Sequence, residues 1–412
     1  SATYPENQKK GVFQNMYLNS YKDSDCCGCS ACEQICPHHC IKMSENGEGF
    51  LYPVIDRTEC VHCGLCEKVC PIENIHKQEQ KDCCYYGWHR DEHIRSLSTS
   101  GAAFIAIAQV CKSSGYQHFY GAAYDEQMKV HHIDNLDFKN PELLRCSKYT
   151  QSRMDNSYSE IKAHLKKGEK VLFSGTPCQV DGLKRYLGKL GEENLFSVAL
   201  VCHGVSSPKA FSIYLKEVEL ENSSSIKNIR FRDKKEEDGK LTHRFTTINL
   251  ENGKELASTN NVYTTAFGIG VMDRESCYSC PYASPSGAGD ITIGDFWGIE
   301  RYIPEINGEI SKGISLLIPH TVVGEQMVSD MERYMKLKKV PIKYAMNDRQ
   351  RQLLGPIERP ERRNVFLKRV LGENKDFHKE ATSAIRVWKI EGYKKRIFKK
   401  IRTLIGRDKV QQ

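Results

Sequence analysis

In the central part of the chain, short apolar runs typical of strands alternate with segments whose apolar residues have helical spacing. Residues 84–89 (CYYGWH), 118–125 (HFYGAAYD) and 170–175 (KVLFSG) are short apolar runs typical of strands. The stretches between them, such as GAAFIAIAQVCKSS (101–114) and PCQVDGLKRYLG (177–188), repeat their apolar residues at helical spacing. Strands that alternate with helices indicate an α/β core with at least some parallel strands.

The same alternation continues to about residue 220 and then gives way to β structure. LFSVALVC (195–202) predicts a strand, and SPKAFSIYLKEVEL (207–220) predicts a helix. From residue 226 the pattern predicts antiparallel strands in IKNIRFRD (226–233) and HRFTTINLENGKELA (243–257), where Asn252-Gly253 marks a hairpin turn.

Cysteines are concentrated near the start of the chain, where CCGCSACEQICPHHC (26–40) holds six of the 18 in the sequence. Disulfide scaffolds are small secreted domains, whereas this chain has 412 residues and opens on polar residues without an apolar signal region, so disulfides are not expected. Four of the six cysteines and Pro37 form C-x2-C-x2-C-x3-C-P, and CVHCGLCEKVCP (60–71) repeats that spacing. Zinc sites favour separated C-x2-C pairs, whereas this unbroken spacing is that of a bacterial-type ferredoxin with two [4Fe-4S] clusters.

In two-cluster ferredoxins the fourth cysteine of each run binds the other cluster, because three close thiolates occupy three corners of one cube. We expect Cys27 and Cys40 to be small buried side chains near the clusters, although either could donate to a ligand or replace one. The Asn46-Gly47 pair predicts a hairpin between the two runs, which completes a ferredoxin-like domain over residues 21–75. The predicted ligands are Cys26, Cys29, Cys32 and Cys70 for one cluster, and Cys60, Cys63, Cys66 and Cys36 for the other.

Four cysteines in the body of the chain also suit metal binding. Cys178 follows Pro177 in the first turn of a predicted helix, where free amides favour a thiolate, and Cys202 ends the next strand. Parallel strands would bring both to one end of a sheet, and Cys277 and Cys280 form a C-x2-C pair on a turn that could fold over them. These thiolates could hold a third iron–sulfur cluster or a zinc ion, or they could be ordinary core cysteines. The residues alone leave that choice open.

Charge changes the picture mainly at the C-terminal end. The chain has a formal net charge of +8, but residues 361–412 alone carry 16 Lys and Arg against 6 Asp and Glu. An amphipathic helix is predicted here, and it either lies on an anionic membrane surface or packs on the body or on a partner. Nucleic acid is not expected because no base-reading motif accompanies the charge. The apolar residues at helical spacing are Ile390, Tyr393, Ile397, Ile401 and Leu404.

Eight ordered motifs carry a resemblance to a known family. Over about residues 84–350 the chain resembles the beta-subunit family of coenzyme F420-reducing hydrogenases and dehydrogenases. The motifs are STSGAAF (98–104), FYGAAYDE (119–126), RCSKYTQS (145–152), LFSGTPCQVDGLKRYL (172–187), LVCHGVSSPKAF (200–211), FRDK (231–234), SCYSCPYA (276–283) and GDITIGDFWGI (289–299).

The resemblance implies that the body binds FAD and a third [4Fe-4S] cluster, because members of that family bind both groups. Its ligands would then be Cys178, Cys202, Cys277 and Cys280. Composition and spacing do not themselves indicate a flavin, since no G-x-G-x-x-G joins a strand to a helix, and Ser100 alternatively caps the helix that ends at Gly115. The flavin contacts that the resemblance implies are Ser98, Ser100, Gly101, Gly121, Ala122, Gly294 and Asp295.

The predicted fold class is thus α+β and α/β. After an N-terminal tail (1–20) comes the small ferredoxin-like two-cluster domain (21–75), followed by a larger mixed α/β flavin-binding domain (84–350). A basic helical tail (361–412) ends the chain.

The predicted function is that of an iron–sulfur flavoprotein oxidoreductase. Clusters carry single electrons and a flavin can exchange a hydride, so an external low-potential donor such as a ferredoxin could reduce the clusters, and the flavin could reduce an unidentified substrate. His203 and Asp295 are the predicted proton donors, although a backbone hydrogen bond and a turn cap are their structural alternatives. The alternative functions are an electron-transfer subunit that serves a separate catalytic partner, and an F420-dependent oxidoreductase. Oxygen-labile clusters predict a cytoplasmic location, with the basic tail reaching the inner membrane face.

Overall fold

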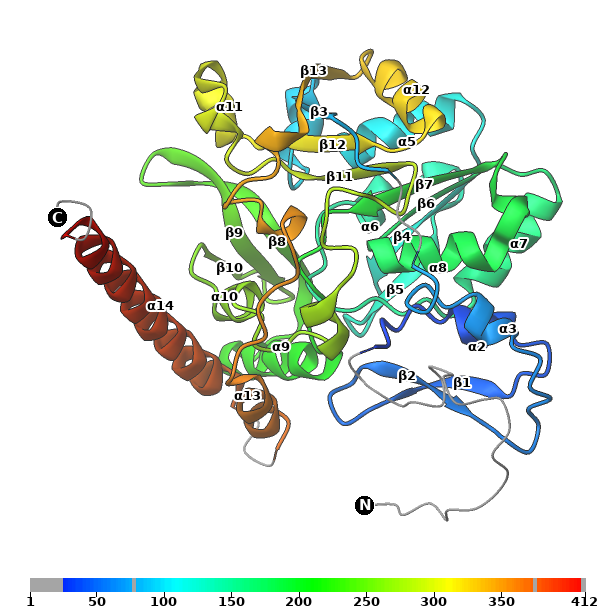
Figure 1. The fold of residues 1–412 in the computed structure, drawn as a ribbon, viewed down its shortest axis with the longest axis horizontal. Coiled ribbons are helices and arrows are strands. Elements are labelled where there is room, and N and C mark those ends of the chain that lie inside the picture. Colours follow the sequence, from blue (N-terminus) through cyan, green and yellow to red (C-terminus); the bar gives the residue numbers. More distant parts are fainter. Residues whose placement is uncertain (1–24, 76–78, 373–375, 409–412) are drawn as a thin grey trace.

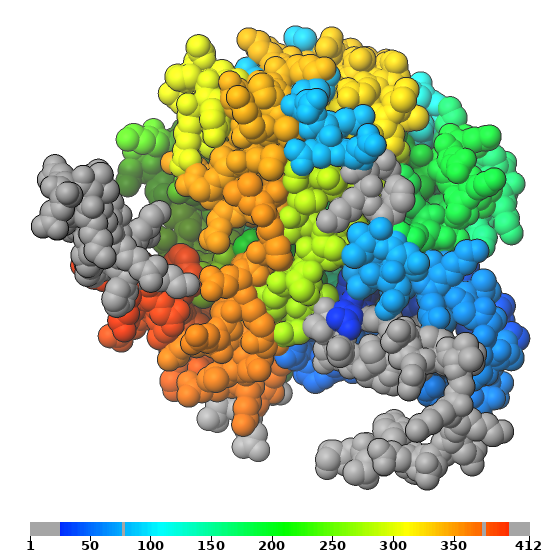
Figure 2. Space-filling model, viewed as in Figure 1, coloured from blue at the N-terminus to red at the C-terminus, as the bar shows by residue number. Residues whose placement is uncertain are grey.

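A computed structural model of the chain describes residues 25–75, 79–372 and 376–408, with the side chains of the last helix described as far as Lys394. A small cysteine-rich domain packs beside a larger α/β body, and a long helix extends from that body (Figure 1). The surface view shows the small domain, in blue, lying directly against the body (Figure 2). The mixed α/β architecture and the helical C-terminal end agree with the predicted fold class.

The small domain is built around one hairpin and two short helices. Strands β1 (Ile41–Glu45) and β2 (Leu51–Ile55) pair in antiparallel fashion, which confirms the predicted hairpin. Asn46 closes the turn because its side-chain oxygen accepts hydrogen bonds from the backbone N–H groups of Glu48 and Phe50, both at 3.0 Å. The helices are α2 (Ala31–Ile35) and α3 (Leu65–Lys68), and each follows the first two cysteines of its run.

The described part of the body contains an eight-stranded sheet in the order β13-β3-β12-β11-β7-β6-β4-β5. Strands β4, β6, β7 and β11 run parallel, which confirms the prediction of parallel strands, and the remaining neighbours are antiparallel. The bounds in chain order are β3 (Cys83–His89), β4 (His118–Tyr124), β5 (Val130–Asp134), β6 (Val171–Gly175), β7 (Leu195–Leu200), β11 (Ile291–Asp295), β12 (Ser315–Pro319) and β13 (Met335–Pro341).

Strand β6 illustrates why this sheet is buried on both faces. Leu172 packs in one apolar core with α5 (Ala103–Ser113) and α12 (Val322–Met331), whereas Val171 and Phe173 pack in another with α7 (Ser157–Lys166) and α8 (Pro177–Leu187). Successive side chains of a strand point to opposite faces, so a strand covered on both sides is apolar throughout. Helix α2 of the small domain lies against α7 and α8, which places the small domain on that face.

A second sheet of three antiparallel strands joins β8 (Ile226–Glu237), β9 (Lys240–Leu250) and β10 (Glu255–Ser258). The turn between β9 and β10 falls at the predicted Asn252-Gly253 pair, which confirms that hairpin. Helices α9 (Pro208–Asn222) and α10 (Val262–Gly268) pack on this sheet and share its apolar core. Shorter helices are α4 (Glu92–Ser96), α6 (Pro141–Leu144) and α11 (Asn307–Ile310).

The C-terminal segment is divided between core and surface instead of forming a separate tail. Helix α13 (Arg363–Val370) and the first turns of α14 (Phe377–Asp408) contribute Phe366, Phe377 and Ala381 to the core of the second sheet. Later along α14 the side chains of Trp388 and Tyr393 are exposed. Among the described helices, none has an apolar stretch that would span a bilayer. The predicted apolar positions Ile397, Ile401 and Leu404 lie outside the described side chains.

Two local predictions are wrong. Helix α5 begins at Ala103, and its N-cap is Ala102 in a left-handed backbone conformation (φ 69°), so Ser100 does not cap it. The Ser100 hydroxyl instead donates to the carbonyl of Ile314 at 2.9 Å, because its loop is held against β12. Strand β7 ends at Leu200, so Cys202 lies in the segment after the strand and outside the ladder of the sheet.

Replacing Phe377 by alanine should destabilise the body by about 3–5 kcal/mol, because its fully buried ring packs against Tyr214 and Tyr263. Urea unfolding of anaerobically prepared protein measures this loss. Trp388→Ala on the same helix is the matched control, since that side chain is 51% exposed and its removal should cost less than about 0.5 kcal/mol. Equal losses in the two variants would contradict the division of α14 into a core part and a surface part.

Candidate functional site

The predicted site residues of the body converge on one edge of the eight-stranded sheet. Gly121-Ala122 lies in the carboxyl-terminal half of β4, and Gly294-Asp295 ends β11. Cys178 and Cys202 follow the carboxyl ends of β6 and β7. Parallel strands end at a common edge, and ligands of open α/β sheets bind outside that edge. The fold therefore gathers residues from four separate motifs at the place where binding is expected.

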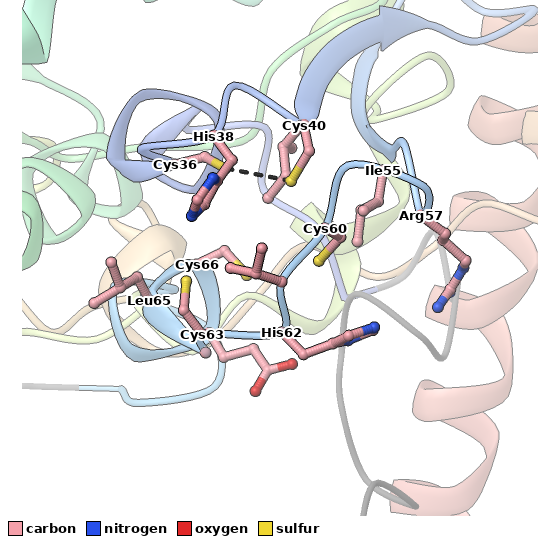
Figure 3. A pocket seen from close by; sticks show the side chains of 14 residues that line it. Cys36, His38, Cys40, Ile55, Arg57, Cys60, His62, Cys63, Leu65 and Cys66 are labelled. Carbon is pink, nitrogen blue, oxygen red and sulfur yellow. Dashed lines mark hydrogen bonds between the residues drawn. The ribbon is translucent and has the colours of Figure 1, made fainter. Parts of the chain in front are cut away.

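The outer set, defined as Cys36, Cys60, Cys63 and Cys66, lines a pocket in the small domain (Figure 3). The fourth cysteine of the first run thus lies with the first three cysteines of the second run, as the ferredoxin spacing predicts. Cys63 is exposed, so this set lies closest to solvent.

The inner set, defined as Cys26, Cys29, Cys32 and Cys70, lines a second pocket of the small domain. Cys26, Cys29 and Cys70 are each buried, with exposed fractions of 7–8%. The exchange of the fourth cysteine between the two runs is therefore present in the fold. That each set binds a [4Fe-4S] cluster through these particular thiolates stays a prediction.

Cys40 lies in the outer pocket without being one of its predicted ligands. Its sulfur is 3.4 Å from that of Cys36 (Figure 3). Burial and the neighbouring Cys36 raise the pKa of Cys40 to about 12. Burial acts in the same direction on Cys36, but hydrogen bonds from the Cys40 thiol and from nearby backbone amides outweigh it and lower the pKa of Cys36. Cys36 is thus the more acidic thiol of the pair, which favours it as the ligand and Cys40 as a hydrogen-bond donor.

The body set, defined as Cys178, Cys202, Cys277 and Cys280, comes together at the sheet edge. Cys178 lies in the first turn of α8, and Cys277 lies on a 3-10 turn (Glu275–Ser279) that ends next to Cys280. Burial raises the pKa of Cys202, and the neighbouring thiols of Cys178 and Cys280 raise it further. Buried thiols that oppose one another's ionisation suit a metal cluster or a zinc ion, whose positive charge would offset theirs.

The inner set and the body set are neighbours across the interface between the small domain and the body. Gly182 lies one helical turn after Cys178 on α8, and a β-carbon at this glycine would lie 3.0 Å from the sulfur of Cys29. The Cys27 thiol interacts with those of both Cys29 and Cys178, so it lies between the two sets. The order through the molecule is therefore outer set, inner set, body set.

Arg274 joins the two parts of the chain at this interface. It is fully buried, and its guanidinium donates to the carbonyls of Cys26 (2.7 Å) and Leu51 (2.8 Å) in the small domain and to the side-chain oxygen of Gln151 (3.0 Å) in the body. It also lies over the ring of Tyr52 at 4.0 Å. Sequence reasoning missed this residue, because a single buried arginine outside any motif gives no periodic or spacing signal.

The loop that carries Ser100 meets Asp295 at the same edge. The hydroxyl oxygens of Ser100 and Ser315 are 3.3 Å apart, and Ser315 pairs with Asp295 between β12 and β11. Lys234 on β8 donates to the carbonyl of Ser100 at 2.8 Å, and burial lowers the pKa of this lysine to about 7. The guanidinium of Arg232 lies 3.8 Å from the Asp295 carboxylate. Ser100 and Asp295, predicted separately as flavin contacts, therefore share one corner of the edge.

Some of the other predicted flavin residues have evident packing roles. The Ser98 hydroxyl donates to the carbonyl of Ile94 at 2.8 Å. A β-carbon at Gly101 would lie 2.4 Å from the carbonyl oxygen of Gly87, so this glycine lets the loop lie against β3. Gly121 faces Leu144. These contacts explain the residue types without requiring a ligand.

Basic side chains of β8 lie at the corner formed by Ser100 and Asp295, and two more lie on a neighbouring segment. Three of them lie along β8, and the segment that carries the other two is joined to β8 by a bridge between Ser147 and Phe231. The side-chain Nε atoms of two of these arginines and the hydroxyl of Thr99 are buried without a hydrogen-bond partner among the described residues. Unpaired buried donors are rare in proteins, so these groups are candidates for binding an anionic ligand or water. The five side chains are Arg145, Lys148, Arg230, Arg232 and Lys234, with the unpaired Nε atoms on Arg145 and Arg232.

The predicted flavin contacts extend along the edge. Strands β4 and β11 are separated by β6 and β7, so Gly121 and Gly294 lie on the order of 14 Å apart at a strand spacing of about 4.8 Å. An isoalloxazine ring alone would not reach both, whereas an extended dinucleotide would. A ligand that contacted both glycines would therefore have to be an extended one.

The two predicted proton donors occupy different surroundings. The ring of His203 lies edge-on to that of Phe267, with the ring centroids 5.1 Å apart, and burial lowers the pKa of His203. Its Nε2 atom is buried and has no hydrogen-bond partner within the described residues. Asp295 instead faces Arg232, which favours a role in orienting that arginine. Catalytic roles for both residues stay predictions.

Comparisons with known proteins confirm the resemblance that the motifs predicted. Residues 168–344 match the C-terminal part of the family described as "Coenzyme F420 hydrogenase/dehydrogenase, beta subunit", and residues 25–74 match "4Fe-4S dicluster domain". The chain is therefore an iron–sulfur protein of an oxidoreductase family. A solved structure of the F420-reducing [NiFe] hydrogenase complex from Methanosarcina barkeri aligns with 77% of this chain and 94% of that chain, at 15% identity and a TM-score of 0.45. No curated protein matches the chain in sequence.

Cys36→Ser should lower the iron content of anaerobically purified protein by about four atoms per chain, because it removes one corner of a cluster. Cys40→Ser is the matched control, since its sulfur lies only 3.4 Å away and it should leave the iron content unchanged. Iron and acid-labile sulfide analysis measures both. The assignment of Cys36 as the ligand fails if Cys40→Ser loses the iron and Cys36→Ser keeps it.

Proposed function

We propose that the protein is an iron–sulfur flavoprotein that takes single electrons from a low-potential donor such as a ferredoxin and reduces a bound substrate by hydride transfer. The three thiol sets and the basic corner at the sheet edge support this proposal. When bound, clusters exchange single electrons and a flavin can exchange electron pairs, so together they connect the two kinds of chemistry.

The observation that carries the proposal is the arrangement of the three thiol sets in series. The outer set includes the exposed Cys63, where a donor protein could approach. The inner set lies against α8 through Cys29 and Gly182, and the body set begins at Cys178 on the same helix. An ordered route from the surface to the sheet edge would serve no purpose in a chain that only binds iron for stability.

The residues around the sheet edge support a flavin as the end of that route. Arg145 and Arg232 offer buried N–H groups that would hold phosphate oxygens. Lys234 anchors the Ser100 loop through two hydrogen bonds to backbone carbonyls, at 2.6 and 2.8 Å, so the loop is fixed before any ligand arrives. The guanidinium carbon of Arg232 lies 4.4 Å from the centre of the Trp297 ring, and the ring centroids of Trp297 and His243 are 5.3 Å apart. Aromatic rings therefore line one side of the corner.

The main alternative is an electron-transfer subunit that passes electrons to a separate catalytic partner. The matched family is described as a beta subunit, which favours an assembly with other chains. Coenzyme F420 as the hydride carrier is a further candidate, because that coenzyme is named in the same description. Both alternatives retain the three clusters and differ only in what receives the electrons.

Acid release of the cofactors from anaerobically purified protein tests the proposal. We expect about one FAD and about 12 iron atoms per chain, as three [4Fe-4S] clusters require. Iron near eight atoms without flavin would leave only the dicluster domain and would overturn the proposal. Iron near 12 without flavin would instead favour the electron-transfer subunit.

Paired variants distinguish a loss of electron transfer through the body set from a general loss of folding. Cys202→Ala should lower the iron content by about four atoms and prevent reduced ferredoxin from bleaching the flavin absorbance. Cys111→Ala is the matched control, because Cys111 is a fully buried cysteine of α5 in the apolar core and should leave both properties intact. Flavin bleaching at the normal rate in Cys202→Ala would exclude the body set as the last step of the route.

We further infer that the exposed part of α14 contacts an anionic membrane surface. Ile390 and Tyr393, which lie on one face of the helix, are 46% and 66% exposed. They lie in a segment of the sequence rich in lysine and arginine, and an amphipathic basic helix with exposed aromatic residues is suited to the interface of an anionic bilayer.

Vesicle flotation tests this contact. The protein should float with phosphatidylglycerol vesicles, and binding should weaken in high salt and in the double variant Ile390→Ser/Tyr393→Ser. Val322→Ser is the control, since Val322 is 86% exposed on a different helix. Flotation that is equal in all variants would show that α14 does not make the contact.

A further inference from the structure

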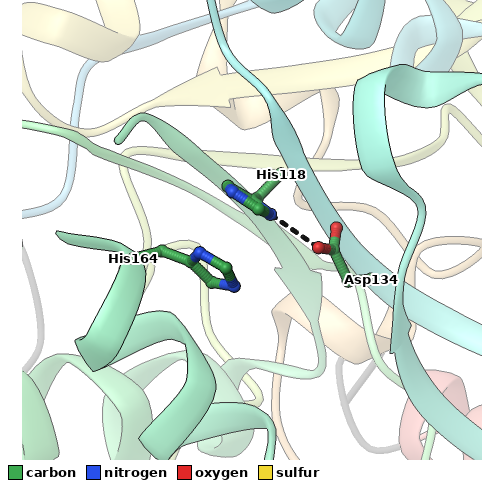
Figure 4. A group of neighbouring side chains, drawn as sticks. All are labelled: His118, Asp134 and His164. Atoms are coloured by element: carbon green, nitrogen blue, oxygen red, sulfur yellow. Dashed lines mark hydrogen bonds and ion pairs between the residues drawn. The ribbon is translucent and has the colours of Figure 1, made fainter. Parts of the chain in front are cut away.

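A cluster of histidines and carboxylates at the amino ends of the parallel strands is complete without a ligand. Figure 4 shows His118, Asp134 and His164, which come from β4, β5 and α7, lying close together. The Asp134 carboxylate lies 2.6 Å from Nδ1 of His118, and that of Glu169 lies 2.6 Å from Nδ1 of His164. Each imidazole therefore has a carboxylate as its hydrogen-bond partner, and these pairs fasten the strands to the helix.

The thiol of Cys27 differs from that cluster, because its neighbours are predicted metal ligands. Its sulfur is in hydrogen-bonding contact with the thiols of Cys29, from the inner set, and Cys178, from the body set. Cys27 is not itself one of the predicted ligands, since the ferredoxin spacing runs from Cys26 to Cys29. It thus touches both thiol sets and belongs to neither.

The backbone that carries this thiol is held by the body. The carbonyl of Cys26 accepts a hydrogen bond from Arg274 at 2.7 Å, and the carbonyl of Cys27 accepts one from the side-chain amide of Gln151 at 3.1 Å. Arg274 and Gln151 are joined to each other by a hydrogen bond of 3.0 Å. The contacts of the interface therefore determine where the Cys27 sulfur lies.

The tyrosine hydroxyls beside this thiol are engaged elsewhere. Tyr158 and Tyr282 belong to the apolar core against which Cys27 packs. The hydroxyl of Tyr158 donates to the carbonyl of Gln179 at 2.7 Å, and that of Tyr282 donates to the carboxylate of Asp181 at 2.5 Å. These protons point to oxygen atoms, whereas the thiol of Cys27 has sulfur neighbours on both sides.

We propose that the Cys27 thiol is a hydrogen-bond donor shared between the clusters of the inner set and the body set, and that it stabilises an electron on either one. This inference rests on the proposed function, because it requires a cluster at each set. A thiol has one proton, so it donates to one sulfur at a time. Hydrogen bonds to ligand sulfurs are among the factors that set cluster potentials, and such a bond favours the reduced, more negative state.

This sharing suits the passage of single electrons from the small domain to the body. Rotation about the Cβ–Sγ bond of Cys27 moves its hydrogen from Cys29 toward Cys178. The hydrogen bond can therefore follow an electron from one set to the other, while the proton stays on Cys27 and no covalent bond breaks. Cys27 is in this role a positioning residue, since it acts through the ligand sulfurs.

Redox titration of anaerobically purified protein, followed by electron paramagnetic resonance, tests the shared hydrogen bond. Cys27→Ala should lower the equilibrium constant for the first electron that enters these two clusters about tenfold, or about 59 mV. Iron should stay at about 12 atoms per chain, because no ligand is lost. Cys27→Ser retains a hydrogen-bond donor of similar size and should restore most of the shift. An unchanged potential in Cys27→Ala, or a loss of about four iron atoms, would overturn the proposal.

Two backgrounds decide whether the hydrogen bond reaches both sets. Cys202→Ala removes a predicted ligand of the body set and leaves the inner cluster, whereas Cys32→Ala removes one from the inner set and leaves the body cluster. In each background, adding Cys27→Ala should lower the equilibrium constant for reducing the remaining cluster of the two about tenfold. A shift in only one background would contradict the shared role.

Cys40→Ala is the matched control, because Cys40 lies beside the outer set, 3.4 Å from Cys36. It should shift the potential of the outer cluster and leave the other two unchanged. An equal shift of the inner and body clusters in this variant would mean that the potentials report a general change, which would overturn the proposal. Iron of about eight atoms in wild-type protein would overturn the proposed function as well, whereas about 12 atoms with no shift in Cys27→Ala would overturn this inference alone.

Discussion

The rest of the arrangement depends on one buried guanidinium. Arg274 belongs to the body, yet two of its hydrogen bonds end on carbonyls of the small domain, at Cys26 and Leu51. A buried charge is costly unless it is paired, and this arginine is surrounded by acceptors, by an aromatic ring and by cysteine thiols that would be anionic as ligands. Its hydrogen bonds therefore hold the small domain against the body. Its charge lies between the inner set and the body set, where it would stabilise electrons added to clusters on either side.

Two glycines allow the small domain and the body to approach each other closely at this contact. Gly28 has a left-handed backbone (φ 70°), and a β-carbon there would lie 2.7 Å from the side-chain nitrogen of Gln151 and 2.9 Å from Arg274. Gly182 on α8 likewise leaves room for Cys29, since a β-carbon at this glycine would lie 3.0 Å from the Cys29 sulfur. Electron transfer between two centres slows steeply with their distance. The two glycines and Arg274 would therefore serve the same end, because all three keep the inner set close to the body set.

Sequence patterns predicted those features that follow from local spacing. The two cysteine runs determined the exchange of Cys36 and Cys70 between pockets, and the alternation of strands and helices placed Cys178 and Cys202 at one sheet edge. Features that depend on tertiary contacts could not be predicted in this way. Ser100 binds a distant carbonyl instead of capping α5, and Phe377 enters the core although its segment is strongly basic.

The position of the basic corner bears on whether the chain is a complete reductase or a subunit. On the proposed route, electrons that reached the body set would arrive beside Arg145 and Arg232. Among the described residues, these arginines have no protein acceptor for some of their buried N–H groups. A chain that only relayed electrons to a partner would need an exposed exit, whereas buried donors without protein acceptors are rare and call for a water or a ligand as their acceptor. The corner is covered by the second sheet, since β8 carries Arg230, Arg232 and Lys234. These donors therefore favour the proposal that electrons first reach a cofactor held inside this chain, and that a partner would receive them from that cofactor.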